Sequence, residues 1–115
     1  MPPVALVVED ELLVQNMLAG IVADLGFDVV ACSNADEALI ILEARRDITL
    51  VITDVDMPGS MNGLKLASVI RTRWPPTRLI VTTGKSRPEV LPDRVHFLGK
   101  PYTEAHVAAA IAIVS

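Results

Sequence analysis

The sequence predicts an α/β protein in which five parallel strands form one sheet with helices on both faces. Short β-rich runs alternate with longer segments of helical spacing, and this alternation is typical of a parallel sheet with crossover helices. The chain has 115 residues, of which 51% are hydrophobic, and a mean hydropathy of +0.46. This is enough apolar material for one core and too short a chain for a second folded domain.

The five predicted strands are short apolar runs, and each gives way to a loop. The third run, Ile-Thr-Leu-Val-Ile-Thr over residues 48–53, is predicted to be buried. Short runs rich in valine and isoleucine are typical of strands. The complete set spans residues 4–8, 27–31, 48–53, 78–82 and 95–98.

Two helices are predicted in the first half of the chain. In the first, apolar residues recur at i, i+4, i+7, i+8 and i+11 and mark one face, and Gly26 ends the helix. The second begins after the N-cap residue Asn34, with Glu37 completing a box-like arrangement, and should end by residues 46–47. The face of the first helix consists of Val14, Leu18, Ile21, Val22 and Leu25.

Two further helices are predicted after the third and fifth strands. One runs from Gly63 to about Arg73, because Trp74 precedes a proline and is disfavoured in the helical region. The other begins after Thr103, whose hydroxyl can cap it. Segment 84–94 contains two prolines and few apolar residues, so the fourth helix of the fold is expected to be short.

The charge of the chain argues against two classes of partner. The net charge is −4, the pI is about 5.0, and the ten basic residues are scattered along the sequence. These values argue against direct binding of nucleic acid or of an acidic membrane. Arg71, Arg73 and Arg78 are the nearest approach to a basic patch, and we expect them to be solvated charges at a helix end.

The cysteine content and the hydropathy pattern suit a cytoplasmic protein. A single cysteine, Cys32, allows no internal disulfide, and its apolar neighbours favour a buried thiol. The sequence has no signal-type segment and no run of about 18 apolar residues. We therefore expect the protein to act in the cytoplasm.

Charged residues follow three of the predicted strands. Glu9 and Asp10 come after the first, Asp54 ends the third, and Lys100 follows the fifth. In an open parallel sheet, ligands bind outside the carboxyl ends of the strands, so these side chains should converge in one charged cleft. Asp56 is expected to add a further carboxylate there.

Such a cluster of acids needs a counter-charge. Two like charges about 4 Å apart repel by roughly 4 kcal/mol at an effective dielectric constant near 20. Lys100 can supply one positive charge, and a divalent metal supplies two. Because the ligands are oxygens, we expect a hard ion, Mg²⁺ with several retained waters. Any one of these acids could simply face water, so the prediction depends on the whole set.

With these residues in this order, the chain resembles the receiver domain of two-component response regulators over nearly its whole length. Each motif alone is weak, but five in the right order with the right spacing are specific. The resemblance implies a flavodoxin-like fold with strand order 2-1-3-4-5 and a site between the first and third strands. The motifs are Glu9-Asp10, Asp54 with Met57-Pro58-Gly59 and Asn62-Gly63-Leu64, Thr82, and Lys100-Pro101.

In that family, an aspartate accepts a phosphoryl group from a phosphohistidine on a sensor kinase. The resemblance implies that Asp54 is this acceptor and a ligand of Mg²⁺. It implies that Asp10 binds the metal directly and that Glu9 is an outer ligand. The backbone carbonyl of Asp56 would complete the protein's share of the ligands.

The resemblance also implies groups that respond to the phosphoryl group. Lys100 would pair with the phosphoryl oxygens, and Thr82 would donate its hydroxyl to them. Phe97 occupies the position of an aromatic residue that turns inward when the threonine moves, so Thr82 and Phe97 would form the switch. The alternatives are an ordinary strand threonine and a plain core phenylalanine. Pro101 would follow a cis peptide bond.

The chain departs from the family in several places. Residues 58–63 hold one more residue than the commonest loop of the family, and Thr83 fills a position where a small residue is preferred. Asp56 lies where side chains tune hydrolysis, by repelling a hydroxide or by orienting a water. The family's output surface is usually built from the fourth helix, the fifth strand and the last helix, and segment 84–94 is shortened here. His96 and His106 have no metal-like spacing and are expected to be surface or satisfied side chains.

We therefore expect a signalling switch and not an enzyme with a separate substrate. Residues 1–115 would form one receiver domain without an output module. Its partners would be a sensor histidine kinase or a histidine phosphotransfer protein, and an unknown downstream protein. It would signal by contact, pass the phosphoryl group onward, or be a piece of a larger protein.

Two rival functions share parts of this pattern. Residues 52–56 resemble the Asp-x-Asp motif of haloacid-dehalogenase phosphatases, but there the nucleophile follows the first strand and a further acidic motif follows the lysine. A flavin-binding or purely structural domain could have the same fold. Its aromatic residues would have to stack on the flavin, and the aromatic content is only 3%.

Overall fold

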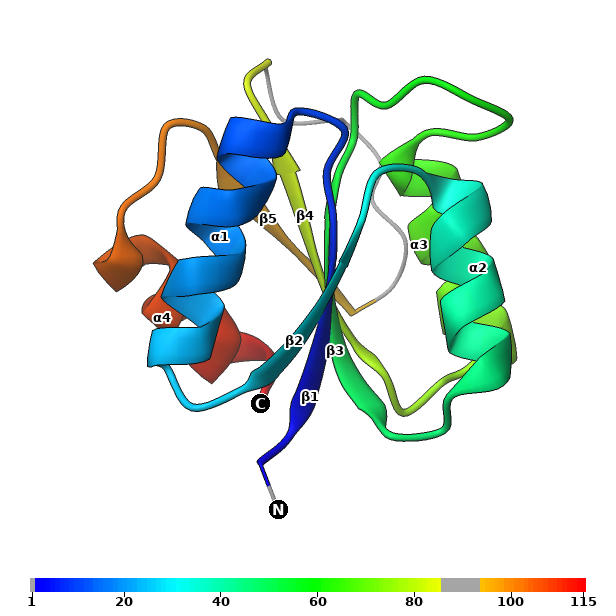
Figure 1. Cartoon of the computed structure of the whole chain (residues 1–115), viewed down its shortest axis with the longest axis horizontal. Coiled ribbons are helices and arrows are strands. Elements are labelled where there is room, and N and C mark those ends of the chain that lie inside the picture. Colours follow the sequence, from blue (N-terminus) through cyan, green and yellow to red (C-terminus); the bar gives the residue numbers. More distant parts are fainter. Residues whose placement is uncertain (1, 86–93) are drawn as a thin grey trace.

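The computed structural model describes residues 2–85 and 94–115, and these form a parallel five-stranded sheet (Figure 1). The strand order is β2-β1-β3-β4-β5, as predicted. The strands are β1 (Val4–Val8), β2 (Asp28–Cys32), β3 (Ile48–Asp54), β4 (Arg78–Thr83) and β5 (Val95–Gly99). The helices are α1 (Leu12–Asp24), α2 (Ala35–Ala44), α3 (Gly63–Arg73) and α4 (Glu104–Val114).

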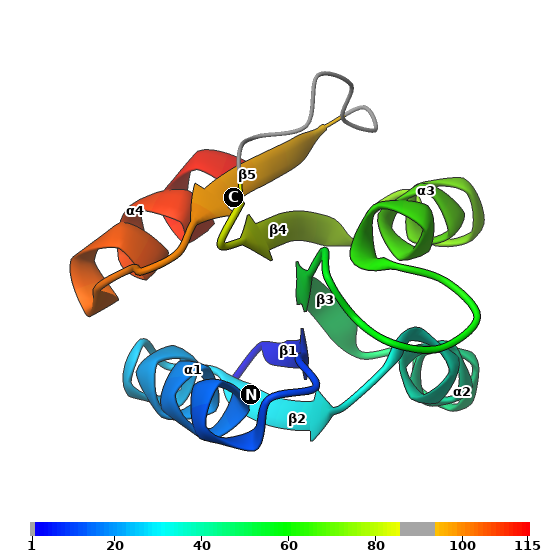
Figure 2. The same ribbon diagram turned by 90° about the horizontal axis from the view of Figure 1, so that it is seen from above.

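The sheet is covered on both sides, which confirms the predicted doubly wound arrangement. Helices α1 and α4 pack on one face, and α2 and α3 pack on the other (Figure 2). Because side chains alternate along a strand, each strand places side chains in both cores. In β1, for example, Ala5 and Val7 contact the α1/α4 core, whereas Leu6 and Val8 contact the α2/α3 core.

The helix boundaries follow from capping groups. The Asn34 and Asn62 side chains accept hydrogen bonds from backbone N–H groups at the starts of α2 and α3. Thr103 caps α4 in the same way, and the exposed His106 ring accepts a hydrogen bond from the Thr103 N–H in return. Gly26 follows α1 at φ 102°, a conformation that glycine adopts readily.

Some predicted strand bounds differ from the structure by one residue, and one predicted segment falls outside the described residues. Strand β2 begins and ends one residue later than expected, at Asp28 and Cys32. The predicted short helix in segment 84–94 lies mostly in residues 86–93, outside the described residues. None of the helices in the described ranges is long and apolar enough to cross a membrane.

Candidate functional site

The carboxyl ends of β1, β3 and β4 bring the predicted site residues together. Strand β1 lies between β2 and β3. The chain adds β2 on one side of β1 and adds β3, β4 and β5 on the other, so the order of strands reverses at β1. The register places Val8 next to Thr53, and Asp54 next to Thr82. Glu9 and Asp10 therefore leave β1 at the level where Asp54 ends β3, which is the switch point where ligands bind in this type of sheet.

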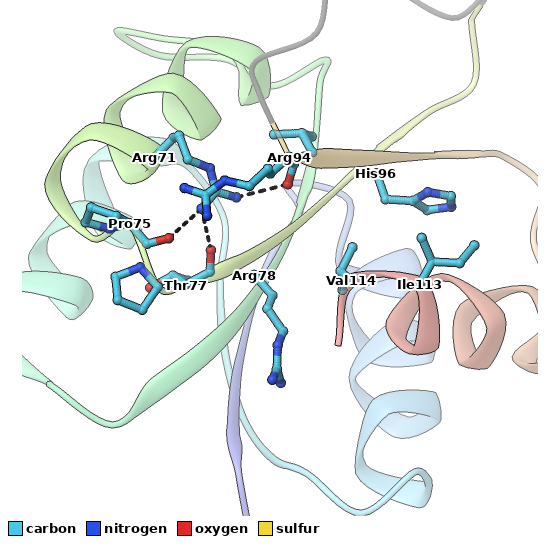
Figure 3. Close-up of a pocket in the computed structure, with 10 residues that line it drawn as sticks. Arg71, Pro75, Thr77, Arg78, Arg94, His96, Ile113 and Val114 are labelled. Atoms are coloured by element: carbon cyan, nitrogen blue, oxygen red, sulfur yellow. Dashed lines mark hydrogen bonds between the residues drawn. The ribbon is translucent and has the colours of Figure 1, made fainter.

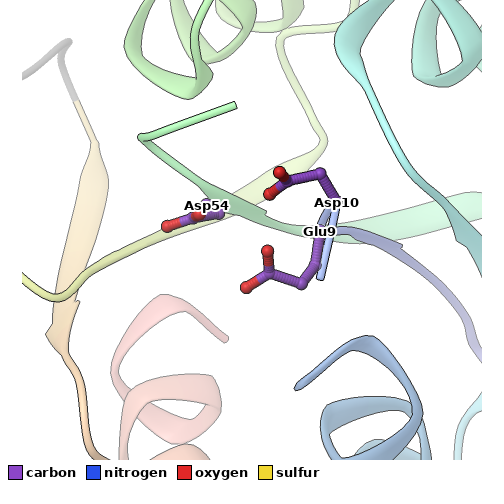
Figure 4. A group of neighbouring side chains, drawn as sticks. All are labelled: Glu9, Asp10 and Asp54. Carbon is purple, nitrogen blue, oxygen red and sulfur yellow. The ribbon is translucent and has the colours of Figure 1, made fainter. Parts of the chain in front are cut away.

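Glu9, Asp10 and Asp54 form an acidic cluster in which one oxygen of each carboxylate lies within 4.8 Å of the others. Figure 4 shows the Glu9 and Asp10 carboxylates extending from the end of β1 on the side of Asp54. Glu9 and Asp54 are buried, at 2% and 5% exposure, whereas Asp10 is exposed. The predicted convergence is thus confirmed for these three acids.

Lys100 supplies the predicted positive charge. Its Nζ donates a hydrogen bond to Glu9 Oε1 at 2.7 Å and lies 3.4 Å from Asp54 Oδ1. The Lys100 backbone N–H bonds to the Thr83 carbonyl, and the peptide bond to Pro101 is cis, as predicted. The ammonium group thus bridges the two buried acids from the end of β5.

Asp54 has a perturbed acidity. Burial, which disfavours the charged form, and the neighbouring Glu9 carboxylate raise its pKa from 3.8 to about 6; Lys100 opposes this shift, and Asp56 adds to it. Burial alone would lower the pKa of Lys100, but its contacts with Glu9 and Asp54 hold that pKa above its ordinary value. The site therefore holds more negative charge than its lysine compensates.

The acidic cluster fits a hard divalent cation. Its ligand atoms are carboxylate oxygens, which Mg²⁺ prefers. Asp54 Oδ1 is buried and makes no hydrogen bond to the described residues, although it lies at ion-pair distance from Lys100. A buried acceptor without a donor is costly, and a cation would satisfy it.

Asp56 does not bring its side chain to the acidic cluster, so the prediction of a further converging carboxylate was wrong. Its carboxylate contacts Thr83 and Lys85 instead, because the loop after β3 turns it toward the end of β4. Thr82 is 2% exposed and lies next to Asp54 in the register of β3 and β4. Phe97 is half-buried on β5, opposite Val81.

Sequence reasoning missed Gln15, which positions the acidic pair. Its Nε2 donates hydrogen bonds to the Glu9 carbonyl at 2.8 Å and the Cys32 carbonyl at 2.9 Å, and thus joins the ends of β1 and β2 to α1. The signal was present in the spacing, because Gln15 is a polar residue on the face that carries Leu18 and Val22. Cys32 is buried as predicted, and burial and Glu37 raise its pKa to about 12.

Gly63 determines how closely α3 approaches β3. A methyl group in place of its hydrogen would overlap the Asp54 backbone carbonyl. The Gly63 N–H donates to the Val55 carbonyl at 3.0 Å, so the first turn of α3 is held against the residue that follows Asp54. Glycine at this position allows the start of α3 to pack directly against the backbone of Asp54.

A separate pocket of about 460 Å³ lies at the opposite end of the sheet (Figure 3). Arg71 borders it and donates hydrogen bonds to the carbonyls of Pro75, Thr77 and Arg94. Arg71 lies in the last turn of α3, as predicted for a helix-end charge, and its hydrogen bonds also join that end of the helix to the segments before β4 and β5. Arg73 pairs with Glu43 at 2.9 Å and lies over the Trp74 ring.

Comparison with known proteins agrees with this geometry. Residues 5–112 match the family described as the response regulator receiver domain. A putative response regulator NtrX-like protein of Rickettsia bellii is 33% identical over 100 residues, which are 86% of this chain and 21% of that protein. The chain thus spans about a fifth of the length of this relative.

Solved structures have the same fold. A response regulator receiver protein from Sinorhizobium medicae superposes with a TM-score of 0.89 at 26% identity, over 98% of this chain and 94% of the other. The response regulator TrrA of Thermotoga maritima, in complex with Mg²⁺ and BeF, gives 0.87 at 24% identity, over 97% and 98%. Together with the match over residues 5–112, these similarities show that the chain belongs to the response regulator receiver domain family of two-component systems.

Proposed function

We propose that the protein is a phospho-acceptor switch in which Asp54 receives a phosphoryl group in the presence of Mg²⁺. The observation that carries the proposal is the buried Asp54 carboxylate, which has one oxygen that receives no hydrogen bond from residues 2–85 or 94–115 and lies beside two further acids and a lysine. Such a carboxylate is held ready for a metal and for an incoming electrophile. Residues 1–115 act as one receiver unit.

The metal would be held by the acids at the ends of β1 and β3. Asp10 and Asp54 are proposed as direct ligands, Glu9 as an outer ligand, and the Asp56 backbone carbonyl as the remaining protein ligand. The donor set consists of oxygens only, which supports Mg²⁺. When bound, Mg²⁺ would neutralise charge on the acceptor and on the incoming group.

Lys100 and Thr82 are proposed to hold the phosphoryl oxygens. A phosphoryl group adds about −1.5 to −2 charge beside acids that already repel one another, so it needs cationic partners. Lys100 already lies 3.4 Å from Asp54 Oδ1, and Thr82 is next to Asp54 in the sheet register. Phosphoryl transfer depends on positioning and charge neutralisation, and these residues supply both.

The phosphoryl donor is proposed to be a phosphohistidine on a sensor kinase or on a histidine phosphotransfer protein. Movement of Thr82 toward the phosphoryl group, with Phe97, would change the surface formed by β4, β5 and α4 for a downstream protein. The burial of Thr82 beside Asp54 supports its coupling to the acceptor. No direct role for nucleic acid or membrane is proposed.

The test is incubation with acetyl phosphate and Mg²⁺, followed by the mass of the intact protein. We expect one phosphoryl group per chain with Mg²⁺ and none with EDTA. A phosphatase of the haloacid-dehalogenase type would instead turn over phosphomonoesters continuously. Sustained turnover without a labelled protein would overturn the proposed switch function.

A further inference from the structure

The Asp56 side chain joins the loop after β3 to the end of β4. Its Oδ2 accepts a hydrogen bond from Thr83 Oγ1 at 3.2 Å, and its Oδ1 lies 3.5 Å from the Lys85 ammonium nitrogen. Thr83 Oγ1 in turn accepts a hydrogen bond from the Lys85 backbone N–H at 3.0 Å. These three residues are called the Asp56 clasp below.

The buried member of the Asp56 clasp is Thr83. Thr83 is 2% exposed, whereas the Lys85 side chain is 79% exposed and that of Asp56 is 44% exposed. An ion pair as exposed as that of Lys85 is screened by water and contributes little. A buried hydroxyl that donates to a carboxylate is stronger, because the acceptor is charged. The Thr83 hydroxyl is therefore the main restraint on the Asp56 carboxylate.

The side chains of Thr82 and Thr83 lie on opposite faces of the sheet. Side chains alternate along β4, where Ile80 packs in the α1/α4 core and Val81 in the α2/α3 core. By the same alternation, Thr82 lies on the face of Asp54, and Thr83 lies on the face of α3. Thr83 therefore does not contact the Asp54 carboxylate. It acts on the site indirectly, through its hydrogen bond to Asp56 in the loop after β3.

We propose that Thr83 is a positioning residue for the Mg²⁺ site: its hydroxyl holds the Asp56 carboxylate and so keeps the Asp56 backbone carbonyl in place beside Asp54. The inference rests on the proposed function, which assigns that carbonyl to the metal. It is supported by the short path from the clasp to the acceptor: Asp56 lies two residues after Asp54, and the Val55 N–H between them bonds to the Thr82 carbonyl at 2.8 Å. The loop after β3 is thus held against the end of β4 at both Val55 and Asp56.

Opening the Asp56 clasp would add loop conformations in which the carbonyl is displaced. The apparent dissociation constant of Mg²⁺ then rises in inverse proportion to the fraction of molecules with the loop in place. Thr83→Val keeps the β-branched shape and removes only the hydroxyl. We expect it to raise the dissociation constant of Mg²⁺, measured by calorimetry, about tenfold, in line with the loss of a hydrogen bond to a charged group.

Matched variants separate this effect from a general loss of structure. Thr83→Ser keeps the hydroxyl and should restore most of the affinity for Mg²⁺. Thr49→Val removes a hydroxyl that donates to the Val4 carbonyl at 3.2 Å, at the other end of the sheet, and should leave the affinity unchanged. Asp56→Ala keeps the backbone carbonyl but also removes a nearby negative charge, so it should weaken binding at least as much as Thr83→Val, and adding Thr83→Val to it should cause no further loss.

Labelling by acetyl phosphate completes the test. The Thr83→Val variant should be labelled more slowly at low Mg²⁺ and should regain most of its labelling rate at saturating Mg²⁺, because its acceptor and Lys100 are intact. An unchanged Mg²⁺ affinity in Thr83→Val, or a loss of labelling that added Mg²⁺ does not reverse, would overturn the positioning role while leaving Asp54 as the acceptor. An unaltered protein that neither binds Mg²⁺ nor is labelled would overturn both proposals.

Discussion

At the scale of single residues, Asp54 combines burial with excess negative charge. The fold keeps this carboxylate at 5% exposure beside Glu9, and Lys100 offsets only part of the cost. Such an arrangement lowers the stability of the folded protein without a ligand. It is also the reason that a cation or a phosphoryl group with its metal would be bound tightly there.

Asp54→Asn should stabilise the metal-free protein at neutral pH. The folded-state pKa of about 6 lies above the ordinary 3.8, so the folded state loses stability as the pH rises from about 4 through 6. Asparagine has no such titration. In EDTA, urea unfolding should show the variant to be more stable by about 1–3 kcal/mol at pH 8 and equal to the unaltered protein below pH 4.

The exposed Asp24 is the control for this measurement. Asp24→Asn removes the same charge from the exposed surface of α1 and should leave the free energy of unfolding at pH 8 close to that of the unaltered protein. Asp54→Asn and the unaltered protein could instead differ in their free energy of unfolding by the same amount from pH 4 to pH 8. That result would show that the folded state does not raise the pKa of Asp54.

Lys100→Met should destabilise the protein most strongly when no metal is present. Removing one member of a buried charge group leaves the others uncompensated, at a cost of about 3 kcal/mol. Millimolar Mg²⁺ would supply positive charge in place of Lys100, so the variant and the unaltered protein should then differ less in their free energy of unfolding. Urea unfolding in EDTA and in Mg²⁺ measures both values, with the exposed Lys65→Met as control. An equal loss in both solutions would argue that Lys100 and the metal do not share a site.

At the scale of elements, the site depends on how the loops return to the sheet. Helix α3 begins at Gly63, which packs against the Asp54 carbonyl. From α1, Gln15 donates hydrogen bonds to carbonyls at the ends of β1 and β2. The loop after β3 is restrained by the Thr83–Asp56 hydrogen bond. The acids are thus placed by contacts between the backbone and neighbouring elements, as well as by their own strands.

Gly63→Ala should destabilise the protein, because the new methyl group has to displace the Asp54 backbone or the start of α3. We expect a loss of about 2–4 kcal/mol, in the range of overpacked or strained core sites. Gly20→Ala is the control: it lies in α1, where a methyl group meets nothing within 4 Å, and it should gain about 0.5–1 kcal/mol. Thermal unfolding measures both, and equal melting temperatures for the two variants would contradict the close packing.

Several elements could be predicted from the sequence for physical reasons that act locally. Apolar spacing placed α1, and the capping groups Asn34 and Thr103 placed α2 and α4. The carboxyl-end rule brought Glu9, Asp54 and Lys100 together. These signals depend on residues close in sequence or on the general geometry of parallel sheets.

Other features could not be predicted, because they depend on contacts between distant segments. The hydrogen bonds of Arg71 to three carbonyls and the turn of Asp56 toward Thr83 arise only when the loops are packed. The same holds for the overlap that requires glycine at position 63. Residue type alone predicted Arg71 as a helix-end charge but not its hydrogen bonds, and it predicted Asp56 to join the acids, which was wrong.

At the scale of the whole molecule, one doubly wound sheet gathers residues 9, 10, 54, 82 and 100 at one edge. A cation that binds only the folded state should therefore stabilise the whole domain. The expected gain is about 2.7 kcal/mol at a hundredfold excess over the dissociation constant. Melting in increasing MgCl₂ measures it, with NaCl at matched ionic strength as control. A melting temperature indifferent to Mg²⁺ would contradict the metal site.

The central claim is that the acids and Lys100 hold a cation and a phosphoryl group together on Asp54. It is tested most directly by treating the protein with phosphoramidate, with and without Mg²⁺, and mapping the modified residue by mass spectrometry of its peptides. The account predicts modification of Asp54 alone, and only when Mg²⁺ is present. Modification of another residue, or labelling of Asp54 that does not depend on Mg²⁺, would contradict it.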